Sequence, residues 1–135
     1  MLIVFFLTQL ILPWYIAHFG DFEGPEKVDS LFLTIMISVI IVPVIETLLC
    51  QLLPIYLLSY LKNIPYWVLI FISSLCFGLQ HLYCVLYILY GFIGGWILAT
   101  AFLIFKKQKD YFFAVVLTAT IHGVFNLIMS VVFDL

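Results

Sequence analysis

Long apolar runs, separated by short polar or turn-forming segments, dominate the sequence. The runs cover residues 2–19, 31–60, 66–80, 82–105 and 111–133. A helix that crosses the hydrocarbon core of a bilayer needs about 20 mostly apolar residues. Backbone groups in lipid must also find hydrogen-bond partners within the protein, which favours helices over open strands. The pattern therefore predicts an all-α fold, a polytopic transmembrane helix bundle of about five spans.

The second run departs from a regular span. It covers residues 31–60, which is longer than one crossing needs, and it contains Pro43 and Pro54. Each proline removes a backbone hydrogen bond from a helix, so we expect a kink or local unwinding near both positions. Asp29 or Ser30 is suited to cap the start of this helix, because short polar side chains accept hydrogen bonds from the first free N–H groups.

The third and fourth runs each have a feature that bears on packing. The third, over residues 66–80, is short, and we expect it to end within the membrane rather than at its surface. Small residues on one helix face let another backbone approach closely, which predicts a packing face on the fourth run. A groove for a substrate chain is the alternative. The fourth run carries Gly91, Gly94, Gly95 and Ala99.

Composition supports a lipid-facing protein. Of the 135 residues 67% are hydrophobic and only 9% are charged, whereas soluble domains carry about 25% charged residues. The net charge of −2 argues against a nucleic-acid partner, which needs clustered Lys and Arg. The first run lacks a basic leading region and a small-residue cleavage pattern, so we expect a retained span. We predict one membrane-embedded domain over residues 1–135.

The distribution of charge predicts the orientation. With five spans, the loops after the second and fourth runs lie on one side, and they hold Lys62 and Lys106, Lys107 and Lys109. The loop over residues 20–29, on the opposite side, holds four acidic residues and one Lys. Because cytoplasmic loops are enriched in Lys and Arg, we expect a cytoplasmic N-terminus and an external C-terminus.

Four polar side chains interrupt the apolar runs. Glu46 lies in the second, His81 ends the third, and His122 and Asn126 lie in the fifth, four residues apart on one helical face. An ionisable residue facing lipid is costly, so these groups should converge on a polar cavity inside the bundle. A carrier would instead place polar residues along a path across the bilayer. Buried polar residues that only hold helices together are the structural alternative.

Such a set supports two kinds of hydrolytic chemistry. A glutamate with a histidine can deprotonate a water molecule and return the proton to a leaving amine. A second histidine and an amide can stabilise the developing oxyanion, which together describes peptide hydrolysis without a covalent intermediate. Alternatively, Glu46, His81 and His122 could be zinc ligands with an open fourth position. The helical H-E-x-x-H arrangement of many zinc peptidases is absent from the sequence.

The cysteines give little support to thiol chemistry. An odd number without regular spacing predicts neither a disulfide framework nor a zinc knuckle. A catalytic thiolate needs an electropositive, accessible site, and no cationic residue is near Cys50 or Cys84 in the sequence. We expect all three, Cys50, Cys76 and Cys84, to be small packing residues.

The order and spacing of the polar residues resemble the CPBP family of intramembrane proteases. That family includes the CaaX-processing endopeptidase of the endoplasmic reticulum and bacterial bacteriocin-processing relatives, and its motifs are EExxxR, FxxxH and HxxxN. Here residues 77–81 read FGLQH and residues 122–126 read HGVFN. The first motif reads ETLLCQ from Glu46, with Thr47 in place of the second Glu and Gln51 in place of the Arg.

The resemblance implies roles for the matching residues. The chain would be a glutamate-dependent intramembrane endopeptidase without a metal cofactor, its motif-bearing core covering about residues 31–133. Glu46 would be the general base, His81 its partner in activating water, and His122 with Asn126 the oxyanion site. The remaining motif positions would support the site or contact substrate: Thr47, Gln51 and Phe77.

The resemblance also bears on substrate and location. A site within the bilayer favours a hydrophobic or lipid-linked peptide. A Thr/Gln form of the first motif occurs in some small bacterial relatives within the family. We expect an integral protein of a bacterial inner membrane. The alternative is a non-catalytic member with the same fold, such as a bacteriocin immunity factor or a peptide-binding scaffold.

Overall fold

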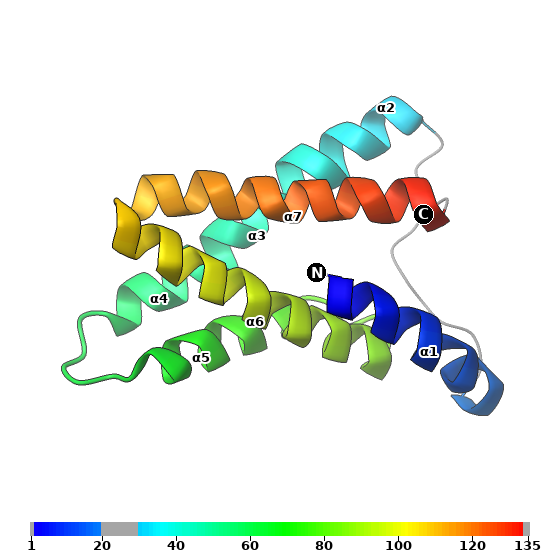
Figure 1. Ribbon diagram of the computed structural model, residues 1–135, viewed down its shortest axis with the longest axis horizontal. Helices are drawn as coiled ribbons and strands as arrows, with labels where there is room; N and C mark the ends of the chain where they lie inside the picture. The colour runs from blue at the N-terminus through cyan, green and yellow to red at the C-terminus, as the bar shows by residue number, and fades with distance from the viewer. Residues whose placement is uncertain (1, 20–29, 134–135) are drawn as a thin grey trace.

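The computed structural model describes residues 2–19 and 30–133 (Figure 1). Within these ranges the chain is almost entirely helical, and they contain no strand. The helices form an elongated bundle, and short loops join neighbouring helices at its ends (Figure 1). The prediction of an all-α fold is therefore confirmed.

Four regular α-helices match four of the predicted runs. They are α1 (Leu2–Phe19), α5 (Tyr66–Leu79), α6 (Val85–Gln108) and α7 (Tyr111–Phe133). The predicted bounds of the fourth run, residues 82–105, are wrong by three residues at each end. Lys106 and Lys107 belong to the last turn of α6 rather than to a loop. Their positive charges are favourable there because the end of a helix carries a partial negative charge.

The second run is helical but irregular. Its α-helical parts are α2 (Leu31–Thr34), α3 (Val42–Glu46) and α4 (Leu53–Leu58), joined by π-helical turns η1 (Ile35–Ile41) and η2 (Thr47–Leu52).

The irregular turns of this run fall where the prolines predict them. Pro43 and Pro54 each lie in the first two positions of the α-helix that follows a π-helical stretch. A wider turn before a proline relieves the clash of its ring with the preceding carbonyl groups. At the start of the run, the Ser30 hydroxyl accepts a 3.5 Å hydrogen bond from the N–H of Leu33. The other predicted cap, Asp29, lies outside the described residues.

Within the described ranges, three helical stretches are long and apolar enough to cross a bilayer. They are Ile35–Leu58, Val85–Gln108 and Tyr111–Val131. Helix α5 is apolar but has only 14 residues, so it is about 21 Å long, against about 30 Å for the hydrocarbon core. A helix of this length that starts at one membrane surface ends below the other.

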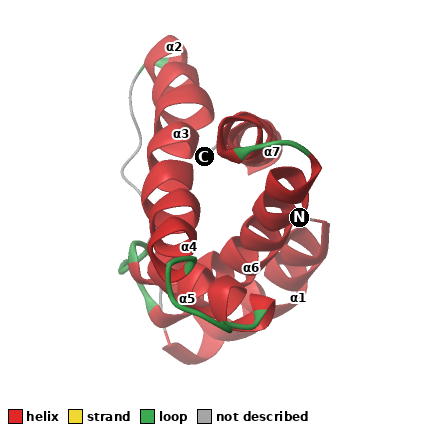
Figure 2. Ribbon diagram, turned by 90° about the vertical axis from the view of Figure 1, so that its left-hand side faces the viewer, coloured by secondary structure: helices red, strands yellow, loops and turns green. Residues whose placement is uncertain are grey.

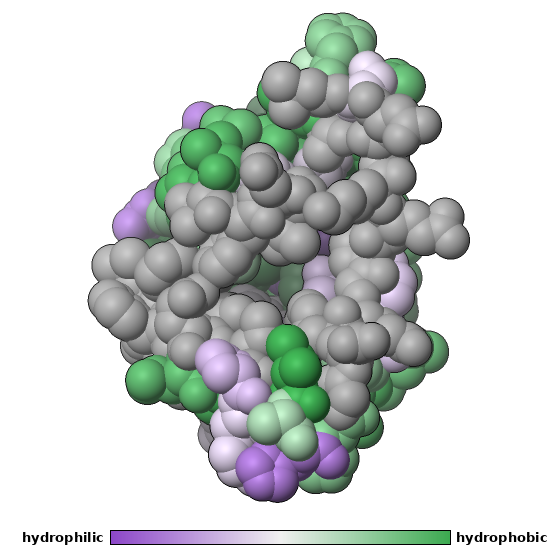
Figure 3. All heavy atoms as spheres, turned by 90° about the vertical axis from the view of Figure 1, so that its right-hand side faces the viewer, coloured by the Kyte–Doolittle hydropathy of each residue, from purple (hydrophilic) through white to green (hydrophobic). Residues whose placement is uncertain are grey.

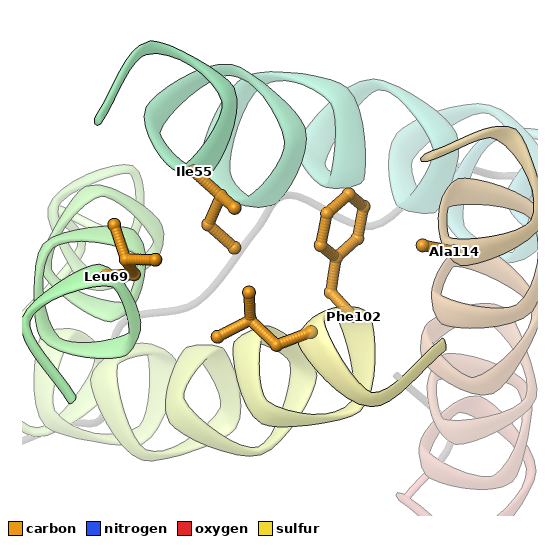
Figure 4. Packing of buried hydrophobic residues seen from close by; sticks show 5 residues of the cluster. Ile55, Leu69, Phe102 and Ala114 are labelled. Atoms are coloured by element: carbon orange, nitrogen blue, oxygen red, sulfur yellow. The ribbon is translucent and has the colours of Figure 1, made fainter. Parts of the chain in front are cut away.

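The surface and the core of the bundle are both hydrophobic. Hydrophobic residues lie along much of the outline that the described residues form in Figure 3, as expected where lipid is the solvent. Inside, α4, α5, α6 and α7 contribute the buried cluster drawn in Figure 4: Ile55, Leu69, Phe102, Leu103 and Ala114. We call these five residues the apolar plug.

Small residues on α6 allow α5 to pack closely, as the sequence predicts. A Cβ atom added to Gly95 would lie 2.8 Å from the Cβ of Phe77, and one added to Gly91 would lie 3.0 Å from Nδ1 of His81. Gly94 is different, because the nearest atom to an added Cβ is 4.0 Å away. The face is thus filled by α5, including the second motif, rather than open as a groove.

One end of the bundle carries the basic loops. The loop joining α4 to α5, with Lys62, and the loop joining α6 to α7 both lie at the left of Figure 1 and face the viewer in Figure 2. Nζ of Lys106 lies 4.6 Å from the centroid of the Tyr111 ring. Paired aromatic and basic residues are typical of a membrane–water interface. Which side of a membrane this end faces stays a prediction.

Candidate active site

Three of the four polar side chains meet inside the bundle. Glu46 ends α3, His81 follows α5, and His122 lies in the middle of α7. Oε1 of Glu46 is 3.9 Å from Nε2 of His81, and Oε2 is 3.5 Å from Nε2 of His122. The exposed fractions of the three side chains are 16% for Glu46, 18% for His81 and 6% for His122. One carboxylate therefore lies between two imidazoles, with His81 on the more open side.

The irregular second run directs Glu46 inward. Thr47, Cys50 and Gln51 of η2 are buried, while Leu48 and Leu49 between them are exposed. This pattern gives the helix one polar inner face and one apolar outer face. The apolar outer face is suited to contact lipid. The carboxylate of Glu46, which directly precedes η2, is therefore held toward α7.

His81 has a defined orientation. Its Nδ1 lies 2.8 Å from the backbone oxygen of Phe77, four residues earlier. A carbonyl oxygen only accepts hydrogen bonds, so Nδ1 carries the proton, and Nε2 of the neutral ring presents a lone pair toward Glu46. An ionised carboxylate and this lone pair are both acceptors. The space between them suits a molecule that donates two hydrogen bonds, as water does.

Aromatic rings hold both histidines in place. The ring centroid of Phe77 is 4.9 Å from that of His81 and 5.3 Å from that of His122. Tyr87, in the first turn of α6, stacks on His81 with the two ring centroids 5.4 Å apart. Phe77 therefore contacts both imidazole rings. Nothing in the sequence distinguishes Tyr87 from the other seven tyrosines.

Asn126 does not join the other three directly. Its Nδ2 donates a 2.8 Å hydrogen bond to the backbone oxygen of Ser38 in η1. Close approach of α7 to η1 makes this possible, since a Cβ added to Gly123 would clash with the backbone oxygen of Val39. Asn126 therefore links α7 to η1, and one of its two amide hydrogens remains for another partner.

The two substituted positions of the first motif face the interior. Thr47 and Gln51 are fully buried, and their side-chain oxygen and nitrogen atoms have no hydrogen-bond partner among the described residues. Thr118, one turn before His122 on α7, is in the same situation. Thr118 was not among the predicted site residues, although its spacing of four from His122 is the signal that it shares the same helical face.

A metal centre was the alternative for Glu46, His81 and His122. Over residues 2–19 and 30–133, no group of three or more His, Cys, Asp or Glu residues is arranged to hold a metal ion. The cysteines are free thiols, and Cys50 is buried. The absence of a metal cofactor stays a prediction.

Comparison with known proteins gives one match. Residues 28–128 match the family described as Type II CAAX prenyl endopeptidase Rce1-like. The matched region covers most of the 135 residues and includes all three motifs. No curated protein and no solved structure matches the chain.

Proposed function

The chain belongs to the Rce1-like family of type II CAAX prenyl endopeptidases, and we propose that it hydrolyses peptide bonds within the membrane with Glu46 as general base. Membership makes it an integral membrane protein of a protease family. One observation supports the role of the carboxylate most strongly. Its two oxygens face Nε2 of His81 and Nε2 of His122 inside the bundle.

The first step is activation of water. A water molecule between Glu46 and His81 donates one hydrogen bond to the carboxylate and one to the lone pair of Nε2. As its oxygen attacks the carbonyl carbon of the peptide, the proton facing Glu46 moves to the carboxylate. His81 orients the water through the lone pair of Nε2, because its own proton is held on Nδ1 by the oxygen of Phe77.

The second step is stabilisation and collapse of the tetrahedral intermediate. His122 donates from Nε2 to the oxygen that becomes negative, and Asn126 supplies the amide hydrogen that Ser38 does not use. The carbon–nitrogen bond then breaks, and Glu46 gives its proton to the leaving nitrogen. The products are a carboxylic acid, which ionises, and an amine. The step requires no covalent intermediate with the protein.

The position of the site favours a membrane-associated substrate. Because α5 is shorter than a full span, His81 at its end lies below the membrane surface. With the basic loops in the cytoplasm, this end of α5 is directed toward the outer face of a bacterial inner membrane. We propose a hydrophobic or lipid-linked peptide as substrate, consistent with the prenyl endopeptidases of the family.

A cleavage assay in proteoliposomes tests the proposal. The probes are a quenched fluorescent peptide with a farnesylated C-a-a-X end, the same peptide without the lipid, and a hydrophobic transmembrane peptide. Glu46→Gln should lower cleavage by about 10²–10⁴-fold, the usual contribution of a general base. Thr100→Val is the control, because that hydroxyl bonds only to the backbone oxygen of Trp96.

Two results would contradict the proposal. Cleavage by Glu46→Gln at the parent rate would remove the carboxylate from the mechanism. Binding of the peptides by the parent without any cleavage would favour the alternative, a non-catalytic scaffold or immunity factor that retains the fold.

A further inference from the structure

Five buried polar atoms have no hydrogen-bond partner within the described part of the chain. They belong to four residues on two elements, and each residue is at least nine-tenths buried. Native proteins leave only a few such atoms per hundred residues, and they are normally satisfied by ordered water. Here the whole set lies on η2 and α7: Oγ1 of Thr47, Oε1 and Nε2 of Gln51, Oγ1 of Thr118 and Nδ1 of His122.

Helix register brings these atoms to one place. The run from α2 to α4 and helix α7 follow opposite directions along the bundle (Figure 1), and η2 contacts α7. At one end of the contact, Glu46 lies 3.5 Å from His122. Further toward the basic loops, Ile55 of α4 and Ala114 of α7 both belong to the apolar plug, with Phe102 of α6 between them (Figure 4).

The two threonines and Gln51 lie between those levels. Thr47 follows Glu46 directly. Gln51 and Thr118 are both fully buried, and each lies about halfway toward the plug along its own helix. From the opposite directions of the two helices we infer that Thr47 is level with His122 and Gln51 with Thr118.

The chemistry of this cluster selects its ligand. The hydroxyls and the amide both donate and accept hydrogen bonds, and Nδ1 of a neutral imidazole whose Nε2 is protonated only accepts. No charged side chain belongs to the cluster, which makes it unsuited to an inorganic ion. A small neutral molecule that both donates and accepts hydrogen bonds fits every member of the set. Water has these properties and is small enough to enter the interior of a helix bundle.

We propose that Thr47, Gln51, Thr118 and His122 form a buried water-binding site that keeps the His122 proton on Nε2, facing Glu46. The bound water donates to Nδ1 and is itself held by the hydroxyls and the amide. This inference rests on the proposed role of His122 as a donor to the oxyanion. Thr118 is a positioning residue in it, because it acts on the reaction only through the imidazole.

The site would make the two histidines opposite in tautomer. His81 is protonated on Nδ1 by virtue of the Phe77 oxygen, whereas His122 is protonated on Nε2. Nε2 of His81 is then an acceptor for the water that lies between it and the carboxylate, and Nε2 of His122 is a donor. The apolar plug closes the far end, so the water is in contact with the active site but not with the opposite surface.

Nitrogen NMR of histidine tests the tautomer directly. The full chain is labelled with ¹⁵N-histidine in lipid nanodiscs, and the His122 signals are identified by their loss in His122→Gln. The parent and Thr118→Ser should show Nε2 protonated, and Thr118→Val should shift the population toward Nδ1 protonation. Thr120→Val is the matched control, because its hydroxyl is exposed and bonds to the Val116 oxygen. An unchanged tautomer in both Thr118→Val and Gln51→Leu would overturn the proposal.

Thermal stability provides an independent test, because a valine substitution should lower the thermal midpoint of a hydrated cluster and raise that of a dry one. If water links the polar atoms, Thr118→Val leaves its neighbours unsatisfied and lowers the thermal midpoint relative to Thr118→Ser. If the interface were dry, removing an unpartnered hydroxyl would raise the midpoint. Thr47→Val provides the same test should Thr118→Val fail to fold. A higher midpoint in these valine variants would contradict the water site.

Catalysis separates this inference from the proposed function. In the cleavage assay Thr118→Val should lower kcat about tenfold with little change in KM, and Thr118→Ser should restore most of it. The NMR and stability measurements do not require activity. If Glu46→Gln cleaves normally while the tautomer depends on Thr118, the proposed function fails and the water site stands.

Discussion

The two interfaces that hold the histidines are built in different ways. Between α5 and α6, glycines bring the backbones together, and His81 is fixed by a bond to its own helix and by ring contacts. Between η2 and α7, the inner faces carry hydroxyls and an amide, and His122 has no bonded partner for Nδ1 among the described residues. The first interface is shaped by packing, and the second by polar groups.

The difference determines how substitutions at each interface affect folding and activity. A packed interface gives one geometry and tolerates little change in volume. A buried polar interface can be satisfied in several ways, and it can change its protonation without a change in shape. We therefore expect substitutions at the α5–α6 interface to act on folding and activity together, and conservative substitutions at the η2–α7 interface to act mainly on activity.

The largest effects should come from the histidines themselves. His81→Ala and His122→Ala should each lower cleavage by about 10²–10⁴-fold, since each removes a group that contacts the reacting atoms. His18→Ala is the control, because that ring is exposed and bonds to the Trp14 oxygen. Parent-level cleavage by either site variant would show that the corresponding interface does not serve catalysis.

Asn126 should follow, because it has a part in both the chemistry and the packing of α7. Asn126→Ala should lower kcat by about 10²-fold through loss of an oxyanion donor, measured in the same proteoliposome assay. Ser130→Ala, one turn further on, removes only a hydroxyl that bonds to the Asn126 backbone oxygen and should leave kcat near the parent value. Equal kcat in both variants would limit Asn126 to its link with Ser38.

Adjacent glycines on α6 provide a matched test of the packed interface. Gly95→Ala places a methyl group 2.8 Å from Phe77 Cβ, and it should destabilise the protein by about 2 kcal/mol and slow cleavage. Gly94→Ala has space for the methyl group and should be tolerated. Unfolding in mixed detergent micelles measures the difference. Equal destabilisation by both substitutions would show that close approach at Gly95 is not what positions Phe77.

Metal removal should have the smallest effect. The proposed mechanism uses only side chains, so prolonged treatment with a strong chelator should leave the cleavage rate unchanged. Elemental analysis of the purified protein provides the complementary measurement. Stoichiometric zinc, with activity lost on chelation and regained on its return, would reassign Glu46, His81 and His122 as ligands.

Much of the fold follows from the sequence because lipid imposes a simple rule. Apolar runs have to become helices when no water is present to satisfy their backbone groups, and α1, α5 and α7 begin where those runs begin. The ends of α6 were predicted less well, since a lysine can lie in a helix while its charge reaches the surface. Prolines indicated where the second run would be irregular, but the length of each π-helical turn depends on contacts with α7.

The parts of the site that depend on spacing within one helix were predicted, and the contacts between residues far apart in the sequence were not. Spacing along one helix placed His122 and Asn126 on a common face, and the cost of burial grouped Glu46 with the histidines. The partner of Asn126 is the backbone of Ser38, 88 residues away. Such a contact leaves no local trace in the sequence. Thr118 shares a helical face with His122, but the sequence does not show that this hydroxyl is buried without a partner.

The short helix α5 has a further consequence for the surrounding lipid. A helix about 9 Å shorter than the hydrocarbon core creates a hydrophobic mismatch at its inner end. Bilayers relieve such a mismatch by local thinning, and the cost rises with every ångström of excess thickness. We expect lipid headgroups and water to be drawn down beside His81, which would give a polar peptide bond a hydrated route to the carboxylate. The protein should therefore work faster in membranes of short-chain lipids than in thick ones, so that membrane thickness itself becomes a control on proteolysis.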